Sequence, residues 1–105
     1  MAKKVKLQTK RDRQNSKLLE KVSAGYVFYC HDGIIFTDIN ELAAGLATMS
    51  DETFAYHSNP EKQDFSNWVR DVVGDEQLAN NLAWSTSREQ AVEYVVARIN
   101  EITCQ

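Results

Sequence analysis

The sequence has 105 residues, of which 43% are hydrophobic and 26% charged, with a formal net charge of −3. This length suits one domain, and the apolar share is sufficient for one core. No apolar run approaches the roughly 20 residues that a membrane span needs, and the basic start lacks the apolar stretch of a secretory signal. We therefore expect one soluble cytoplasmic domain without membrane contact.

Charge is divided unevenly along the chain. Residues 1–21 contain eight Lys and Arg against Asp12 and Glu20, a net of +6, so the remaining residues carry −9. This asymmetry is typical of a basic arm that contacts a polyanion, although a solvated tail that aids solubility has the same composition. We predict a flexible basic arm over residues 1–11 and a single α+β domain over residues 12–105. The predicted contacts to DNA or RNA are Lys3, Lys4, Lys6, Lys10, Arg11, Arg13, Lys17 and Lys21.

A helix is predicted over residues 12–22. Leu18, Leu19 and Val22 share one of its faces, whereas basic residues line the neighbouring face at helical spacing. We expect this helix to dock on the domain by its C-terminal end.

A β-hairpin follows the helix. Residues 26–30 and 34–37 are β-rich and flank Asp32-Gly33, a pair typical of a two-residue turn. Both faces of such a hairpin are apolar, so both need a cover. Helices can cover one face. The other face can be covered by the N-terminal segment or by a second subunit, and the second subunit would give a homodimer through the hairpin. The expected pairs are Tyr29 with Phe36 and Cys30 with Ile35.

The rest of the chain is predicted to be helical, and each helix has a recognisable start. The expected N-terminal caps are Asp38, Ser50, Asp64, Asp75 and Thr86. Asp38 and Thr86 have Glu three residues further on, as in a capping box, and Gly74 suits the left-handed position after a helix. The predicted fold class is α+β, with one β-hairpin packed on a small bundle of about four to five α-helices.

The centre of the chain resembles a family of small microbial domains. The matching stretch, from Phe28 to Leu82, covers about half of the chain. Relatives commonly have Asn-Asp-Phe where this chain has Gln63-Asp64-Phe65. No activity is established for the family, so the resemblance implies the fold and no reaction. Its most specific part reads H-x6-D-F-x2-W-[VI]-x-D-V-x-G-D and consists here of His57, Asp64, Phe65, Trp68, Asp71, Gly74 and Asp75.

His57 and Asp64 are the leading candidates for chemistry, because a carboxylate can fix the imidazole tautomer for acid–base catalysis. The alternative role is structural, since a His that ends one helix and bonds to the next helix's cap locks the turn between them. No nucleophile or Gly-rich phosphate loop accompanies the pair. We therefore interpret the motif as structural and expect no catalytic residue.

Metal and base-stacking sites are not favoured either. Cys30 and His31 would point to opposite faces of a strand, and Cys104 provides no matching pair, so we expect reduced thiols, no metal and no cofactor. The hairpin aromatics lack neighbouring cations, which favours packing over base stacking. We expect Trp68 in the core and Trp84 partly exposed. The hairpin aromatics are Tyr26, Phe28, Tyr29 and Phe36.

These observations predict a non-enzymatic binding module whose basic arm contacts nucleic acid or a ribonucleoprotein surface. The alternative is a protein–protein interaction or structural module in which the basic tail is incidental. An enzyme that uses His57 and Asp64 is the third hypothesis.

Overall fold

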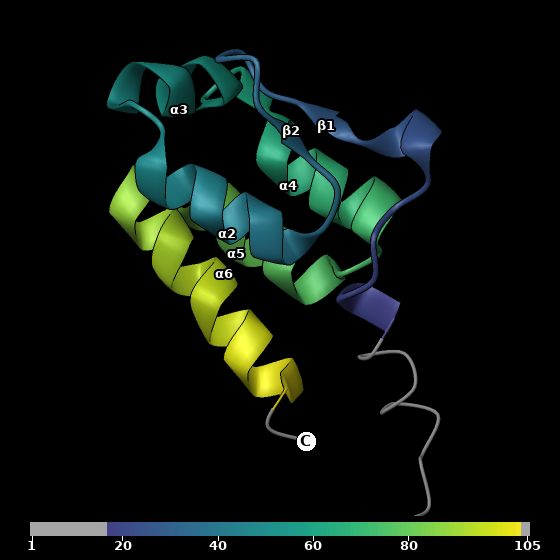
Figure 1. Ribbon diagram of the computed structural model, residues 1–105. Helices are drawn as coiled ribbons and strands as arrows, with labels where there is room; N and C mark the ends of the chain where they lie inside the picture. Colours follow the sequence, from purple (N-terminus) through teal and green to yellow (C-terminus); the bar gives the residue numbers. More distant parts are fainter. Residues whose placement is uncertain (1–16, 104–105) are drawn as a thin grey trace, which may run out of the picture.

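The computed structural model describes residues 17–103, in which a small helical bundle carries two short antiparallel hairpins (Figure 1). The expected α+β fold is confirmed, and the second hairpin is an addition to it. In chain order the elements are η2 (Ala24–Tyr26), β1 (Phe28–Tyr29), β2 (Ile35–Phe36), α2 (Ile39–Thr48), α3 (Asp51–His57), β3 (Ser58–Asn59), β4 (Lys62–Gln63), α4 (Asp64–Trp68), η3 (Val69–Val73), α5 (Glu76–Trp84) and α6 (Arg88–Thr103).

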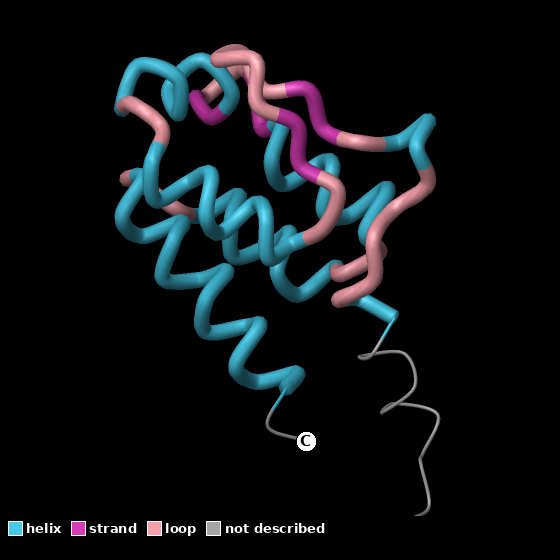
Figure 2. Tube along the Cα trace, viewed as in Figure 1, coloured by secondary structure: helices cyan, strands magenta, loops and turns pink. Residues whose placement is uncertain are grey.

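The helices enclose one core, and the β1–β2 hairpin lies over it beside α2 and α4 (Figures 1 and 2). Helix α6 runs along α2, and Arg88 at its start donates from Nη1 to the carbonyls of Leu46 and Ala47, at 2.8 and 3.1 Å. None of the helices within residues 17–103 has the length and apolar content of a membrane span. The largest fully buried side chains are Phe36, Ile39, Leu42, Leu46, Leu78, Val69 and Val95.

The helix predicted over residues 12–22 ends earlier than expected. Residues 12–16 lie outside the described part of the chain, and of the remainder only Lys17 and Leu18 are helical. The chain then turns to run beside the end of β2, where the Val22 amide donates to the Thr37 carbonyl at 2.8 Å. The Val22 amide thus bonds to β2 rather than to the carbonyl four residues before it, as it would in a helix. Leu18, Leu19 and Val22 still pack against the core.

The hairpin register differs from the prediction by one residue. The pairs are Phe28 with Phe36 and Tyr29 with Ile35, because the loop has three residues rather than two. Gly33, with φ of 93°, is the loop's left-handed residue, and its amide donates to the Cys30 carbonyl. A shift of one residue exchanges the faces of a strand. Phe28 and Phe36 are therefore both buried, whereas Tyr29 and Ile35 are both exposed.

Most of the predicted helix caps are confirmed. Asp38, Ser50 and Asp75 each accept a hydrogen bond from the backbone amide three residues further on, at 2.8 to 3.1 Å. Thr86 was expected to begin α6, but Ser87 accepts from the Gln90 amide instead. The Gln90 side chain accepts from the amide of Thr86, the residue before this cap, so the cap is displaced by one residue from the prediction.

The α4–η3 segment departs from the expected single α-helix. Asp64 is its first residue rather than a side-chain cap, because its carboxylate is engaged by His57. A π-helical turn over η3 follows, and Gly74, with φ of 90°, ends it. Trp68 is buried, as predicted, and its Nε1 donates to the Tyr26 carbonyl at 2.8 Å.

Replacing Gly45 is predicted to destabilise the domain, because Phe36 packs directly on it. A Cβ at this position would overlap two carbons of the Phe36 ring, whereas a Cβ at Gly25 would meet nothing within 4 Å. Gly45→Ala should lower the free energy of unfolding by about 1–3 kcal/mol, despite the better helix propensity of Ala. Gly25→Ala, the matched control, should change it by less than about 0.5 kcal/mol. Equal urea midpoints for the two variants would contradict this packing.

Candidate functional site

The predicted basic residues fall mostly outside the described chain. Lys3, Lys4, Lys6, Lys10, Arg11 and Arg13 precede residue 17, so the structure places only Lys17 and Lys21. Lys17 is exposed at the start of the described chain. Lys21 Nζ bonds to Asp38 Oδ2 and Thr37 Oγ1, each at 3.0 Å, and lies 3.5 Å from Glu41 Oε2.

These contacts make Lys21 part of the start of α2. The hydrogen bond to Asp38 raises the pKa of Lys21 above its ordinary value, and hydrogen bonds from Thr37 lower the pKa of Glu41. Asp38 itself caps α2 through the Glu41 amide. Lys21 therefore helps to hold the start of α2, while its side chain remains 65% exposed.

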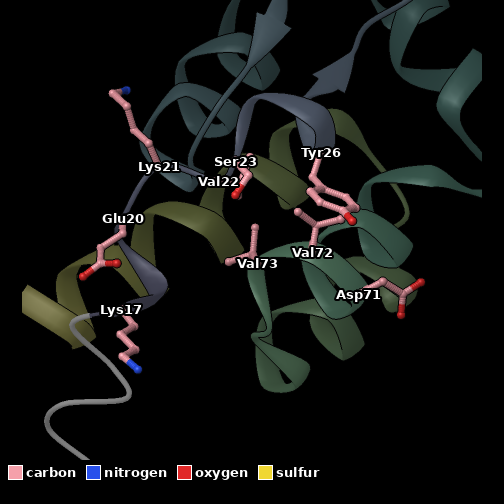
Figure 3. Close-up of a pocket in the computed structure, with 9 residues that line it drawn as sticks. All are labelled: Lys17, Glu20, Lys21, Val22, Ser23, Tyr26, Asp71, Val72 and Val73. Carbon is pink, nitrogen blue, oxygen red and sulfur yellow. The ribbon is translucent and has the colours of Figure 1, made fainter.

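An open hollow of about 460 Å³ lies where the first described residues meet η3 (Figure 3). Lys17 and Lys21 point in different directions from its rim, and the Glu20 carboxylate lies between them. Tyr26 lies against Val72 across the hollow. Because the two cations diverge and an acidic residue separates them, this hollow does not present a phosphate-binding cluster.

His57 is the centre of the sequence motif, and the structure uses both of its ring nitrogens internally. It is buried, with 5% of its surface exposed. Nε2 is 2.9 Å from the backbone nitrogen of His31, and Nδ1 is 2.9 Å from Asp64 Oδ2. An amide N–H can only donate, so Nε2 must accept and Nδ1 must carry the proton given to Asp64.

Aromatic rings enclose this imidazole. Phe28, Tyr56 and Phe65 lie with their centroids 4.9 to 5.2 Å from that of His57. The Tyr56 ring stacks on the His31 ring at 4.0 Å, and Lys62 Nζ lies 3.9 Å from its centroid, although Tyr56 remains 47% exposed. The His57 nitrogens thus face protein groups, and neither is offered to a substrate.

The remaining motif residues do not gather around His57. Phe65 and Trp68 belong to the core, and Asp71 is exposed. Asp75 is buried at the start of α5, where its Oδ2 bonds to Arg98 Nε at 2.7 Å. Burial opposes the Arg98 charge, but the hydrogen bonds to Asp75 and Glu101 raise its pKa. Residues 23 positions apart give no local signal, so the sequence did not reveal this pair.

Cys30 and His31 do not come together with other ligands. Within residues 17–103, no group of three His, Cys, Asp or Glu side chains is arranged to hold a metal ion. Cys30 is buried, and this burial raises the pKa of its thiol. Cys104 lies outside the described residues.

The hairpin aromatics divide between core and surface. Phe28 and Phe36 stack on each other inside, at 5.7 Å, so they cannot serve as a base-stacking platform. Tyr26 and Tyr29 are exposed, and Trp84 at the end of α5 is 79% exposed. The structure thus leaves large apolar side chains available for contacts on the surface.

No family model, curated protein or solved structure matches this chain.

The two bonds of His57 are predicted to stabilise the fold. His57→Ala removes both and leaves the His31 amide without its acceptor, which should cost at least about 2 kcal/mol in free energy of unfolding. His57→Gln, which retains an acceptor, should cost less. In His31→Ala the backbone donor remains, so this control should cost under about 1 kcal/mol. Urea titrations compare the three variants, and a wild-type midpoint for His57→Ala would show that the bonds contribute nothing.

Proposed function

We propose that this chain is a non-enzymatic binding module whose basic N-terminal arm contacts nucleic acid or a ribonucleoprotein surface. The observation that carries the proposal is the division of charge. Residues 17–103 contain six Lys and Arg against fourteen Asp and Glu, a net of −8. Four of those six cations are in ion pairs with carboxylates: Lys21, Lys62, Arg88 and Arg98.

Of the other two cations, Arg70 donates to the Asn80 side chain and Lys17 is exposed, so the cations that can meet phosphates are concentrated in the arm, with Lys17 and Arg70 in addition. Phosphate contacts dominate non-specific affinity for nucleic acid, whereas an acidic surface is repelled by it. The proposed setting is the cytoplasm, where an unpaired thiol such as Cys30 stays reduced. Such contacts would not distinguish one base sequence from another.

The geometry of His57 supports the non-enzymatic part of the proposal. A general base needs a ring nitrogen that can reach the proton it removes. Both nitrogens of His57 are bonded to His31 and Asp64, and the site is covered by aromatic rings. Catalysis by His57 with Asp64 as its orienting partner would require the bond from the His31 amide to Nε2 to break.

A second candidate, a protein-interaction module, is favoured by the apolar surface of the hairpin. Tyr29, Ile34 and Ile35 are 70%, 55% and 47% exposed, and clustered exposed apolar side chains mark contact sites. The homodimer expected from the sequence belongs to this candidate. The two candidates are compatible, because one concerns the arm and the other the folded domain.

Binding should depend steeply on salt and should need the arm. If the six cations before residue 17 meet phosphates of duplex DNA, affinity should fall about a thousandfold between 50 and 200 mM salt. Deleting residues 1–13 should abolish most of that dependence while the domain stays folded. Fluorescence anisotropy with duplex DNA, single-stranded DNA and structured RNA, over a salt series, measures both effects.

Two matched substitutions sharpen this experiment. Lys17→Gln should lower the salt slope by about one contact, because its side chain is exposed. Lys21→Gln should leave the slope unchanged, because its amine is bonded to Asp38. Full-length protein that binds none of the nucleic acids near physiological salt, or binding that survives the deletion unchanged, would favour the interaction module instead.

A further inference from the structure

The tip of the β1–β2 hairpin, residues 30–34, is attached to the helices through the ring of His57. Nε2 accepts from the His31 amide, and Nδ1 donates to Asp64 Oδ2 at the start of α4, each at 2.9 Å. The residue is 5% exposed, and aromatic rings lie against it. One nitrogen accepts and the other donates, which is the pattern of the neutral ring.

A proton on Nε2 is incompatible with the bond to the hairpin tip. An imidazolium has a hydrogen on both nitrogens and can only donate. The hydrogen on Nε2 would face the N–H of His31, and two donors form no hydrogen bond. Turning the ring over would place carbon atoms where the nitrogens now bond. The protonated ring therefore loses the hairpin tip, whereas it can keep Asp64.

The carboxylate that faces His57 is shared with another cation. Asp64 Oδ2 lies 2.9 Å from Nδ1 of His57 and also 3.4 Å from Nζ of Lys62, on β4. A charged His57 would bring two cations to one carboxylate whose side chain is 33% exposed to water. Burying an ion is costly unless its charge is paired and its hydrogens are bonded. Opening of the tip would let water reach Nε2 and lower this cost.

Further ionisable groups lie on the tip and on α3. The His31 ring stacks on Tyr56 at 4.0 Å, and its centroid is 6.5 Å from that of His57, so two protonated rings would repel each other. The exposed carboxylate of Asp32 accepts from a backbone amide within the turn. Burial raises the pKa of the Cys30 thiol, which keeps it uncharged. The acidic residues of α3 lie at the end of that helix opposite His57: Asp51 and Glu52.

We propose that His57 is a pH-sensitive latch, whose neutral ring holds the hairpin tip and whose protonation at Nε2 releases it. The open position of the tip can accept the proton on Nε2 and the closed position cannot, so acid shifts the population toward the open one. The other end of the hairpin stays attached, because Thr37 is bonded to Val22 and Glu41. The tip therefore moves while the helices remain.

Release of the tip would change the surface of the protein-interaction candidate. Tyr29, Ile34 and Ile35, its exposed apolar side chains, lie at or beside the tip. Contacts made through them would then depend on pH. The latch is independent of the basic arm and of nucleic-acid binding.

Nitrogen-15 NMR of the full-length protein between about pH 8 and about pH 5 tests the latch. The His57 ring nitrogens and the His31 backbone amide should change together in one transition. The amide should lose its protection from exchange, corrected for the intrinsic effect of pH, while far-UV circular dichroism keeps the helical signal. A His57 ring that takes up a proton while the His31 amide stays unchanged overturns the proposal. So does a ring that stays neutral until the helices unfold.

Two variants separate the latch from other effects of acid. In His57→Gln, the side-chain oxygen can accept from the His31 amide but takes up no proton, so this amide should stay unchanged over the same range. His31→Asn removes the other ring and keeps the backbone donor, so the amide of residue 31 should titrate as in wild type. An amide that titrates in His57→Gln, or one that no longer titrates in His31→Asn, assigns the effect to another group and overturns the proposal. If His57→Gln does not fold, the wild-type titration alone decides.

Discussion

The arrangement of the domain depends on the imidazole of His57, which joins the tip of the hairpin to the start of α4. One ring nitrogen accepts from the His31 amide and the other donates to Asp64, each at 2.9 Å. The hairpin itself has only two residue pairs in its ladder, too few to hold its position unaided. Because the imidazole is buried, a broken bond would leave a polar group without a partner, and this penalty favours one position of the hairpin. With the hairpin fixed, Phe28 and Phe36 face the core, and Ile35 is exposed to solvent.

The same arrangement separates the roles of the charged residues. Within residues 17–103, three of the four cations paired with carboxylates lie at helix ends: Lys21 at the start of α2, Arg88 at its end and Arg98 at the start of α5. An acidic domain of this kind contributes little attraction to a polyanion. The proposed nucleic-acid contacts therefore depend on the arm, and the second candidate, a protein-interaction role, depends on the exposed apolar side chains of the hairpin. Neither requires a catalytic group, which agrees with the internal use of both His57 nitrogens.

Local signals in the sequence predicted the helices well and the contacts between distant segments poorly. Caps such as Asp38 and Asp75 act within one helical turn, so residue type and spacing sufficed to find them. The hairpin register depends on whether the loop has two or three residues, and Asp-Gly occurs in both kinds of loop. The proximity of His57 and Asp64 was expected, but the cap role of Asp64 was wrong, because a tertiary partner competes for its carboxylate. The bond to the His31 amide joins residues 26 positions apart, and no sequence pattern indicates it.

The most direct test of this account is the tautomer of His57, read from the nitrogen-15 spectrum of the imidazole rings in the full-length protein near neutral pH. The account predicts a neutral ring with its proton on Nδ1, exchanging slowly with solvent, and an unprotonated Nε2. The exposed ring of His31 should exchange its protons faster and serves as the internal reference. A proton on Nε2 of His57, or rapid averaging between the two tautomers, would contradict the account, because a nitrogen would then be free for the acid–base role that the structure argues against.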